Sequence, residues 1–361
     1  IGARAAGVDP PASTLAAASS SRTPVEKILA LESGLTRTLP LFERANAQLA
    51  EVSPAALPAP YAASVRDAQS RLPALTATVR TAVDSFDALL SAIGAAGTKR
   101  YLVVFQNNAE LRPTGGFIGS FALLDINRGA IKKMEIPGGG SYDLKGSLAL
   151  RLESPLPLHL VNSRWQFQDA NWSPDFPTSA RTLERFYEKS GGPTVDGVIA
   201  INQSVMVPLL AAVGPVAMPE YGKTITADNF YAETQKAVEL EYDRTKNRPK
   251  QFIADLAPKV IAKVLAADDK TLIAVMVALH DAFDSKDVQM YFRDARVQSK
   301  VAALGWDGAL KSPQGDYLAI VHANIAGQKS DLAMKDVVTH EAQLLPDGSS
   351  IVTLTMRRTH T

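Results

Sequence analysis

The sequence predicts an α/β (α+β) domain with a mixed central sheet flanked by helices, preceded by an α-helical hairpin. Three observations predict this class. Residues 1–98 are rich in Ala and Leu, and their only aromatic residues are Phe42, Tyr61 and Phe86. From Lys99 onward, short β-branched and aromatic runs alternate with helical patterns. The chain ends in two strand-like runs around the turn residues 346–348.

Apolar residues recur at close to the helical period in two N-terminal stretches, residues 24–49 and 60–93. The segment between them, SPAALPAP, has the composition of a turn. We therefore predict two long helices folded back on each other, a helical hairpin over residues 23–98. The preceding segment, residues 1–22, contains two prolines and a serine cluster and is predicted to be flexible.

Strands and helices alternate through the α/β domain predicted for residues 99–335. Asn127-Arg128-Gly129 is typical of a turn between two strands, and Gly214-Pro215 is typical of a helix end. A β-hairpin is predicted at the C-terminus, residues 336–361, and we interpret it as the start of a further β domain. The predicted strands are residues 99–107, 117–126, 130–136, 195–201, 287–292 and 316–323, and the predicted helices are residues 179–189, 204–213 and, as two or three helices, 227–283.

Charge and cysteine content exclude several classes of function. The chain has 38 Lys and Arg against 37 Asp and Glu, whereas a nucleic-acid-binding protein normally has a basic excess. The absence of cysteine excludes disulfide scaffolds, thiol catalysis and cysteine zinc sites. No apolar run is long enough to span a bilayer. Because the chain begins at Ile1 and stops within a strand-like run, we expect a piece of a longer protein.

The first candidate site is the polar segment at residues 106–120, which follows an apolar strand and contains a glycine pair. Glycine lets the backbone approach a ligand closely. Arg112 offers a planar fork suited to phosphate or carboxylate, and Asn107, Asn108 and Thr114 are suited to orient it or to bind oxygen atoms. The alternative, equally open, is a structural turn in which Arg112 pairs with a neighbouring or buried acid such as the one two residues before it.

The second candidate site is the long loop at residues 164–180, which carries oxygen ligands in a Pro-containing stretch. Asp169, Asn171 and Asp175 are residue types that hold a hard cation such as magnesium beside a phosphate. The alternative is a loop held down by its two tryptophans, with Asp175 or Thr178 capping the following helix.

The third candidate site is a run of cations at residues 241–252, which includes Arg244 and Arg248. Such a run is usually a solvated helix face. It is equally able to form one wall of an anion-binding pocket.

Three motifs occur in order: QNNAELRPTGGFIGS, QDANWSPDFP and DGVIAINQSVMVPLLAAVGPV. Together with NIAGQKSD at residues 324–331, they resemble a family of bacterial envelope proteins, common in actinobacteria, that is catalogued as a domain of unknown function. The resemblance covers residues 99–331. It implies an extracytoplasmic location and an anchor in the cytoplasmic membrane, through a helix upstream of the helical hairpin.

That family is in turn similar to the LytR-CpsA-Psr proteins, which transfer glycopolymers from a polyprenyl diphosphate carrier onto the cell wall. The segment LRPTGGFIGSFALLDINRGAIKKMEIP resembles their Arg-x-Asp-Thr strand hairpin, which places Arg112 on a phosphate-binding arginine. The segment DRTKNRPKQFIADL resembles their Arg-x-x-Arg-Gln helix start, which places Arg244 or Arg248 on another, followed by Gln251. The resemblance implies a LytR-CpsA-Psr-like mixed sheet.

Two departures from the LytR-CpsA-Psr pattern bear on catalysis. Thr114 and Gly115 stand where the family has its metal-binding acid, and glycines replace the Arg-Asp that follows the next strand. The magnesium site of the family is therefore not reproduced residue by residue, and Asp169 or Asp175 would have to substitute. The resemblance supports a shared fold better than shared catalysis.

Two functions remain open. The first is an envelope protein that binds a polyprenyl-linked glycan or lipid phosphate and transfers glycopolymer to the cell-wall polymer, with no nucleic-acid partner. We expect Arg112→Ala to remove ligand binding and to leave the fold intact. The second function is a catalytically inactive envelope scaffold or adhesion module with the same fold. For the first function, the resemblance and the motifs assign Arg112 and Asp169 to catalysis, Asp169 and Asp175 to magnesium, and Asn107, Asn108, Thr114, Asn171, Arg244, Arg248 and Gln251 to the ligand.

Overall fold

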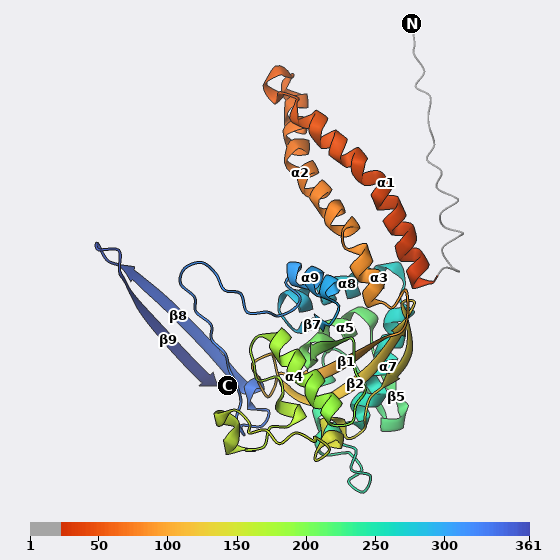
Figure 1. Ribbon diagram of the computed structural model, residues 1–361, viewed down its shortest axis with the longest axis vertical. Coiled ribbons are helices and arrows are strands. Elements are labelled where there is room, and N and C mark those ends of the chain that lie inside the picture. Colours follow the sequence, from red (N-terminus) through yellow and green to blue (C-terminus); the bar gives the residue numbers. More distant parts are fainter. Residues whose placement is uncertain (1–22) are drawn as a thin grey trace. The chain divides into compact units, whose positions relative to one another are not determined.

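The computed structural model describes residues 23–361 (Figure 1). The segment predicted to be flexible, residues 1–22, lies outside the described residues. The chain divides into two compact units, Ile1–Lys99 with Asp125–Lys133, and Arg100–Leu124 with Met134–Thr361.

The first unit contains the predicted helical hairpin, which is confirmed. Its helices are α1 (Pro24–Ala50), α2 (Ala59–Val83) and α3 (Phe86–Ala92). A capping box begins α1, in which Thr23 Oγ1 accepts a hydrogen bond from the Glu26 backbone. Polar side chains join α1 to α2, since Asn46 Nδ2 donates to Thr76 Oγ1 at 2.7 Å.

The main sheet is mixed and five-stranded, with the order β3-β2-β1-β4-β7. The second unit contains β4, β7, nearly all of β1 and most of β2. β1 and β4 pair in parallel, from Tyr101 opposite Gly197 to Gln106 opposite Asn202. β4 and β7 pair antiparallel. This confirms the predicted fold class. The strands are β1 (Lys99–Asn107), β2 (Phe117–Asn127), β3 (Ala130–Glu135), β4 (Gly197–Asn202) and β7 (Val288–Phe292).

Alternate residues of the central strands face opposite sides of the sheet. Leu102 and Val104 of β1 pack in the main core with α4 (Phe176–Lys189). Val103 and Phe105 face the other side, where they line a cavity. The helices that contribute to this second side are α5 (Met206–Val213), α6 (Phe230–Glu239), α7 (Gln251–Leu265) and α8 (Asp269–Asp284).

The sequence patterns were wrong or incomplete at three places. Residues 316–323, predicted as a strand, are irregular and mostly exposed, because no neighbouring strand takes up their backbone hydrogen bonds. Helix α9 (Ala295–Ala303) was not predicted. The short pair β5 (Val216–Met218) and β6 (Lys223–Ile225) was not predicted either.

The C-terminal hairpin is confirmed as β8 (Met334–Leu344) paired antiparallel with β9 (Ser350–His360) (Figure 1). Among the described residues, no helix is both long enough and apolar enough to cross a membrane.

Candidate functional site

A cavity of about 720 Å³ lies between one face of the sheet and the helices on that side. Its wall is mainly aliphatic and aromatic, and it is therefore shaped for an apolar ligand. β1 and β4 supply its floor through Val103, Phe105 and Ile199, and α7 supplies much of its opposite wall. The α7 residues that line the cavity are Ile253, Leu256, Ala257, Val260, Ile261, Val264 and Leu265.

Four charged side chains interrupt this apolar wall, and we call Glu110, Glu239, Lys250 and Lys329 the charged cluster. Lys329 Nζ forms an ion pair with Glu239. Burial raises the pKa of Glu110, whereas the nearby Arg112 and Lys329 lower it. Burial lowers the pKa of Lys250, and the negative charge of Glu110 opposes that shift. The cavity therefore combines a long apolar wall with a compact polar end.

Lys250 stands out in the charged cluster because its ammonium has no hydrogen bond or ion pair within residues 23–361. Its backbone N–H donates to the carbonyl of Gly138 at 2.8 Å, one residue before α7 begins. Its side chain packs against two glycines, Gly119 and Gly140. A Cβ at Gly119 would lie 3.7 Å from the Lys250 ammonium, and one at Gly140 would lie 2.7 Å from the Lys250 Cγ. The glycines make room for the partly buried lysine.

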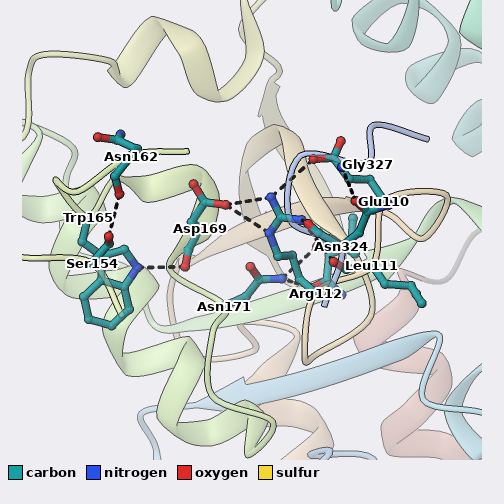
Figure 2. A network of polar contacts seen from close by, with 12 residues as sticks. Glu110, Leu111, Arg112, Ser154, Asn162, Trp165, Asp169, Asn171, Asn324 and Gly327 are labelled. Carbon is teal, nitrogen blue, oxygen red and sulfur yellow. Dashed lines mark hydrogen bonds and ion pairs between the residues drawn. The ribbon is translucent and has the colours of Figure 1, made fainter. Parts of the chain in front are cut away.

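Arg112 is held entirely by protein acceptors (Figure 2). Its Nε and Nη2 both lie 3.1 Å from Asp169 Oδ1, and Nη2 lies 3.3 Å from Glu110 Oε1. Its Nη1 donates to the backbone carbonyl of Asn324 at 2.7 Å and to that of Leu111 at 3.1 Å. The sequence left open whether this arginine pairs with acids of the chain, and the structure shows that it does.

Asp169 is buried beside Arg112, and a hydrogen bond to its backbone carbonyl also holds it in place. Trp165 Nε1 donates to the Asp169 carbonyl at 2.9 Å (Figure 2). Burial raises the pKa of the Asp169 carboxyl, while the charge of Arg112 and its hydrogen bond lower it. The arginine and this carboxylate therefore stabilise each other's charged forms inside the fold.

The polar side chains of the first two candidate segments meet in a buried amide network. Asn171 Nδ2 donates to Gln106 Oε1 at 2.7 Å, to Thr114 Oγ1 at 2.9 Å and to the Gly116 carbonyl at 2.8 Å. Thr114 Oγ1 donates in turn to Gln106 Oε1 at 2.6 Å. Asn171 and Thr114 thus hold the β1–β2 connection in place. Neither lines the cavity, but their shared hydrogen-bond partner Gln106 does.

Asn107 and Asn108 lie at the end of β1. Asn107 lines the cavity, and its Oδ1 accepts a hydrogen bond from the Ala109 backbone at 3.0 Å, which shapes the turn. Asn108 forms a hydrogen bond with the hydroxyl of Tyr231 on α6. These two residues connect the sheet to the helical wall of the cavity.

The other predicted ligand-binding residues lie apart from Arg112. Arg244 and Arg248 are exposed, although the Arg248 stem packs against Gly138, where a Cβ would lie 3.0 Å from its Cδ. Gln251 Nε2 donates to Asp255 Oδ1 at 2.8 Å within α7. The cation that the 241–252 run brings to the cavity is Lys250. The sequence signal for it was the cation run itself, but periodicity could not tell which cation turns inward.

The carboxylates predicted to hold magnesium are engaged with the chain. Asp175 caps α4, since its Oδ2 accepts from Thr178 N at 3.1 Å and its Oδ1 from Leu310 N at 3.1 Å. The capping alternative for Asp175 is therefore confirmed. Asp169 faces Arg112, whose guanidinium takes the place a cation would occupy. Within residues 23–361 no three His, Cys, Asp or Glu side chains gather in a way that could hold a metal. Held in this way, these two carboxylates do not fit a magnesium ion.

Arg112, Asp169, Asn171 and the polar β1–β2 connection belong to one continuous stretch of the sequence. Residues 96–238 match the family DUF4012, described as a protein of unknown function. The match confirms the resemblance to a family of unknown function. Lys250 and Lys329 of the charged cluster lie beyond the DUF4012 region, so the cavity is completed by the residues that follow it.

Solved structures similar to this chain include proteins from three bacteria. Protein gbs0355 from Streptococcus agalactiae is 17% identical, with a TM-score of 0.37, over 60% of this chain and 76% of that one. Lin1025 from Listeria innocua is 13% identical, with a TM-score of 0.32, over 71% and 91%. The transcriptional regulator yvhJ from Bacillus subtilis is 11% identical, with a TM-score of 0.30, over 72% and 90%. No curated protein matches the chain significantly. Likeness this weak carries no argument about function.

Proposed function

We propose that this chain is an extracytoplasmic protein of the cell envelope that binds an anionic lipid, with the tail in the apolar cavity and the headgroup at the charged cluster. A polyprenyl phosphate or polyprenyl-linked glycopolymer is the ligand that the resemblance to LytR-CpsA-Psr proteins implies. The observation that carries the proposal is the Lys250 ammonium, which has no partner in the described part of the chain and lies at the polar end of a cavity of about 720 Å³.

The charges of the cluster favour an anion over a cation. Glu239 is paired with Lys329, and Glu110 with Arg112. Among residues 23–361, that leaves the Lys250 ammonium without a hydrogen-bond or ion-pair partner, in a site where burial disfavours its charged form. A phosphate placed beside it would accept charge-assisted hydrogen bonds from this ammonium. An amine headgroup would instead add a second unpaired cation.

Transfer of a glycopolymer to the cell wall is a further step of this proposal, with Arg112 and Asp169 as its candidate catalytic residues. The guanidinium would stabilise a developing phosphoryl charge only by giving up one of its present acceptors. The backbone carbonyl of Asn324 is the acceptor that can leave at least cost, because the two carboxylates would otherwise lose their cation.

The second candidate function is an envelope scaffold without catalysis. It is favoured by one observation, which is that the donors of Arg112 point at acceptors of the chain itself. An arginine used in this way holds loops together and does not need a ligand.

The test is native mass spectrometry of the purified chain with decaprenyl phosphate. We expect one lipid bound per chain, with binding weakened about tenfold or more in Lys250→Gln because a buried charge-assisted contact is lost. Lys246→Gln is the matched control, since Lys246 belongs to the same cation run but its side chain is 74% exposed. Absence of any lipid adduct on the wild type would refute the proposal. An equal loss of lipid binding in Lys250→Gln and Lys246→Gln would mean that positive charge attracts the lipid nonspecifically, which would also refute the proposal.

A further inference from the structure

Two hydroxyls in the cavity wall have no hydrogen-bond partner among the described residues. They are Ser120 Oγ on β2 and Thr234 Oγ1 on α6. Ser120 is 1% exposed and Thr234 is 7% exposed, so bulk water does not serve them. Buried hydroxyls in a folded protein are normally paired, and an unpaired one costs free energy comparable to a lost hydrogen bond. A pure hydrocarbon in this cavity would leave both of them unpaired.

Ser120 is also close to the headgroup site. It directly follows Gly119, whose missing Cβ leaves room for the Lys250 ammonium. A lipid whose phosphate contacts Lys250 therefore brings the first atoms of its tail past Ser120. In a polyprenyl phosphate those atoms are hydrocarbon, whereas in an acylglycerol phosphate they are hydroxyl and ester oxygens.

The size of the cavity gives an independent argument. A water molecule takes up about 30 Å³ in the liquid, and a methylene group or an oxygen atom is of similar size. The cavity of about 720 Å³ therefore holds on the order of 24 such groups. That is enough for one fatty-acyl chain with a glycerol phosphate. A polyprenyl carrier is several times longer than an acyl chain, and most of its tail would extend out past Leu265, which lines the cavity and is 74% exposed.

We propose that the cavity is selective for a single-chain acyl phospholipid, whose ester carbonyl and glycerol hydroxyl hydrogen-bond Ser120 and Thr234 while its phosphate contacts Lys250. This inference rests on the proposed function, because it names which anionic lipid the same cavity prefers. Polyprenyl phosphate then binds as a weaker ligand of the same site.

A matched pair of lipids tests the inference: palmitoyl lysophosphatidic acid, which carries the ester carbonyl, and its hexadecyl ether analogue, which lacks only that carbonyl. Decaprenyl phosphate is the third ligand. Affinities are measured by titration of the delipidated chain. We expect the ester lipid to bind about tenfold more tightly than the ether lipid and than decaprenyl phosphate, since one buried hydroxyl gains its acceptor.

Variants of the chain assign the preference to the two hydroxyls. Of Ser120→Ala and Thr234→Val, the variant that removes the partner of the ester carbonyl should lose the preference for ester over ether, while its affinity for the ether lipid stays within about twofold. The variant that removes the partner of the glycerol hydroxyl should weaken both lipids alike. Ser141→Ala is the control, because that buried hydroxyl donates to the Gly119 carbonyl and does not line the cavity. It should keep the full preference, and thermal melting of each variant shows that it is folded.

The outcomes separate the inference from the proposed function. If the wild type binds the ester and ether lipids equally, or decaprenyl phosphate most tightly, the inference is overturned and the proposed function stands. A preference that persists unchanged in both hydroxyl variants overturns it as well. If none of the three lipids binds, the proposed function fails and the inference fails with it.

Discussion

Replacement of Arg112 by Ala tests whether this arginine stabilises the fold. The Arg112 side chain is 4% exposed and is surrounded by the carboxylates of Asp169 and Glu110, whose side chains are 10% and 21% exposed. Its removal leaves two largely buried carboxylates without their cation and the Asn324 carbonyl without a donor. Loss of one partner from a buried ion pair costs roughly 3–5 kcal/mol, so we expect Arg112→Ala to lower the free energy of unfolding by about that amount at pH 7. The sequence alone predicted an intact fold.

The dependence of this loss on pH identifies its cause. Burial already raises the pKa values of Asp169 and Glu110, and Arg112 opposes both shifts. Without the arginine, both pKa values rise further above those of the unfolded chain. A carboxyl with a raised pKa destabilises the fold as pH rises through that pKa, and it costs nothing where it is protonated in both states. The difference between Arg112→Ala and wild type should therefore be largest at pH 7 and shrink toward pH 4.

Urea unfolding of both chains at pH 4, 5.5 and 7 measures this difference. Arg80→Ala is the control, because Arg80 forms an ion pair with Glu43 that is largely exposed, and such pairs contribute about 0–1 kcal/mol. An Arg112→Ala chain that is within about 1 kcal/mol of wild type at pH 7, or that loses the same amount at every pH, would refute the reasoning. The guanidinium would then be free to serve a ligand.

Two further predictions concern stability. Glu184 of α4 is 8% exposed, its Oε1 has no hydrogen-bond partner among the described residues, and burial raises its pKa from 4.5 to about 7. Its contribution to stability should be full below about pH 4.5 and fall as pH rises to about 7, by roughly 3 kcal/mol; Glu184→Gln should flatten this dependence in urea unfolding, and parallel curves for the two chains would contradict it. Gly140 has φ +64°, and a Cβ there would lie 2.3 Å from the Gly119 carbonyl oxygen. We expect Gly140→Ala to destabilise by about 2–3 kcal/mol, against about 1 kcal/mol for Gly146→Ala, whose φ is +84° with no atom within 4 Å of its Cβ; equal losses would show that only backbone strain matters.

Much of the fold follows from local sequence. The strand Lys99–Asn107 has the predicted bounds, and the hairpins around residues 128–129 and 346–348 follow from their turn residues. The helical hairpin follows from apolar periodicity. The strand expected at residues 316–323 shows the limit of such patterns, since this apolar segment pairs with no strand of the described chain.

The sequence by itself determined the elements and the polar segments, because period and turn chemistry act between residues close in the chain. Only the tertiary structure decided what those segments do. Asp169 is 57 residues from Arg112, and Asn324 is 212 residues from it, yet both are its acceptors. The same holds for Lys250, whose side chain lies against Gly119 and Gly140, two glycines more than 100 residues before it in the chain. Burial and pairing depend on which distant residues come together, and no local pattern encodes that.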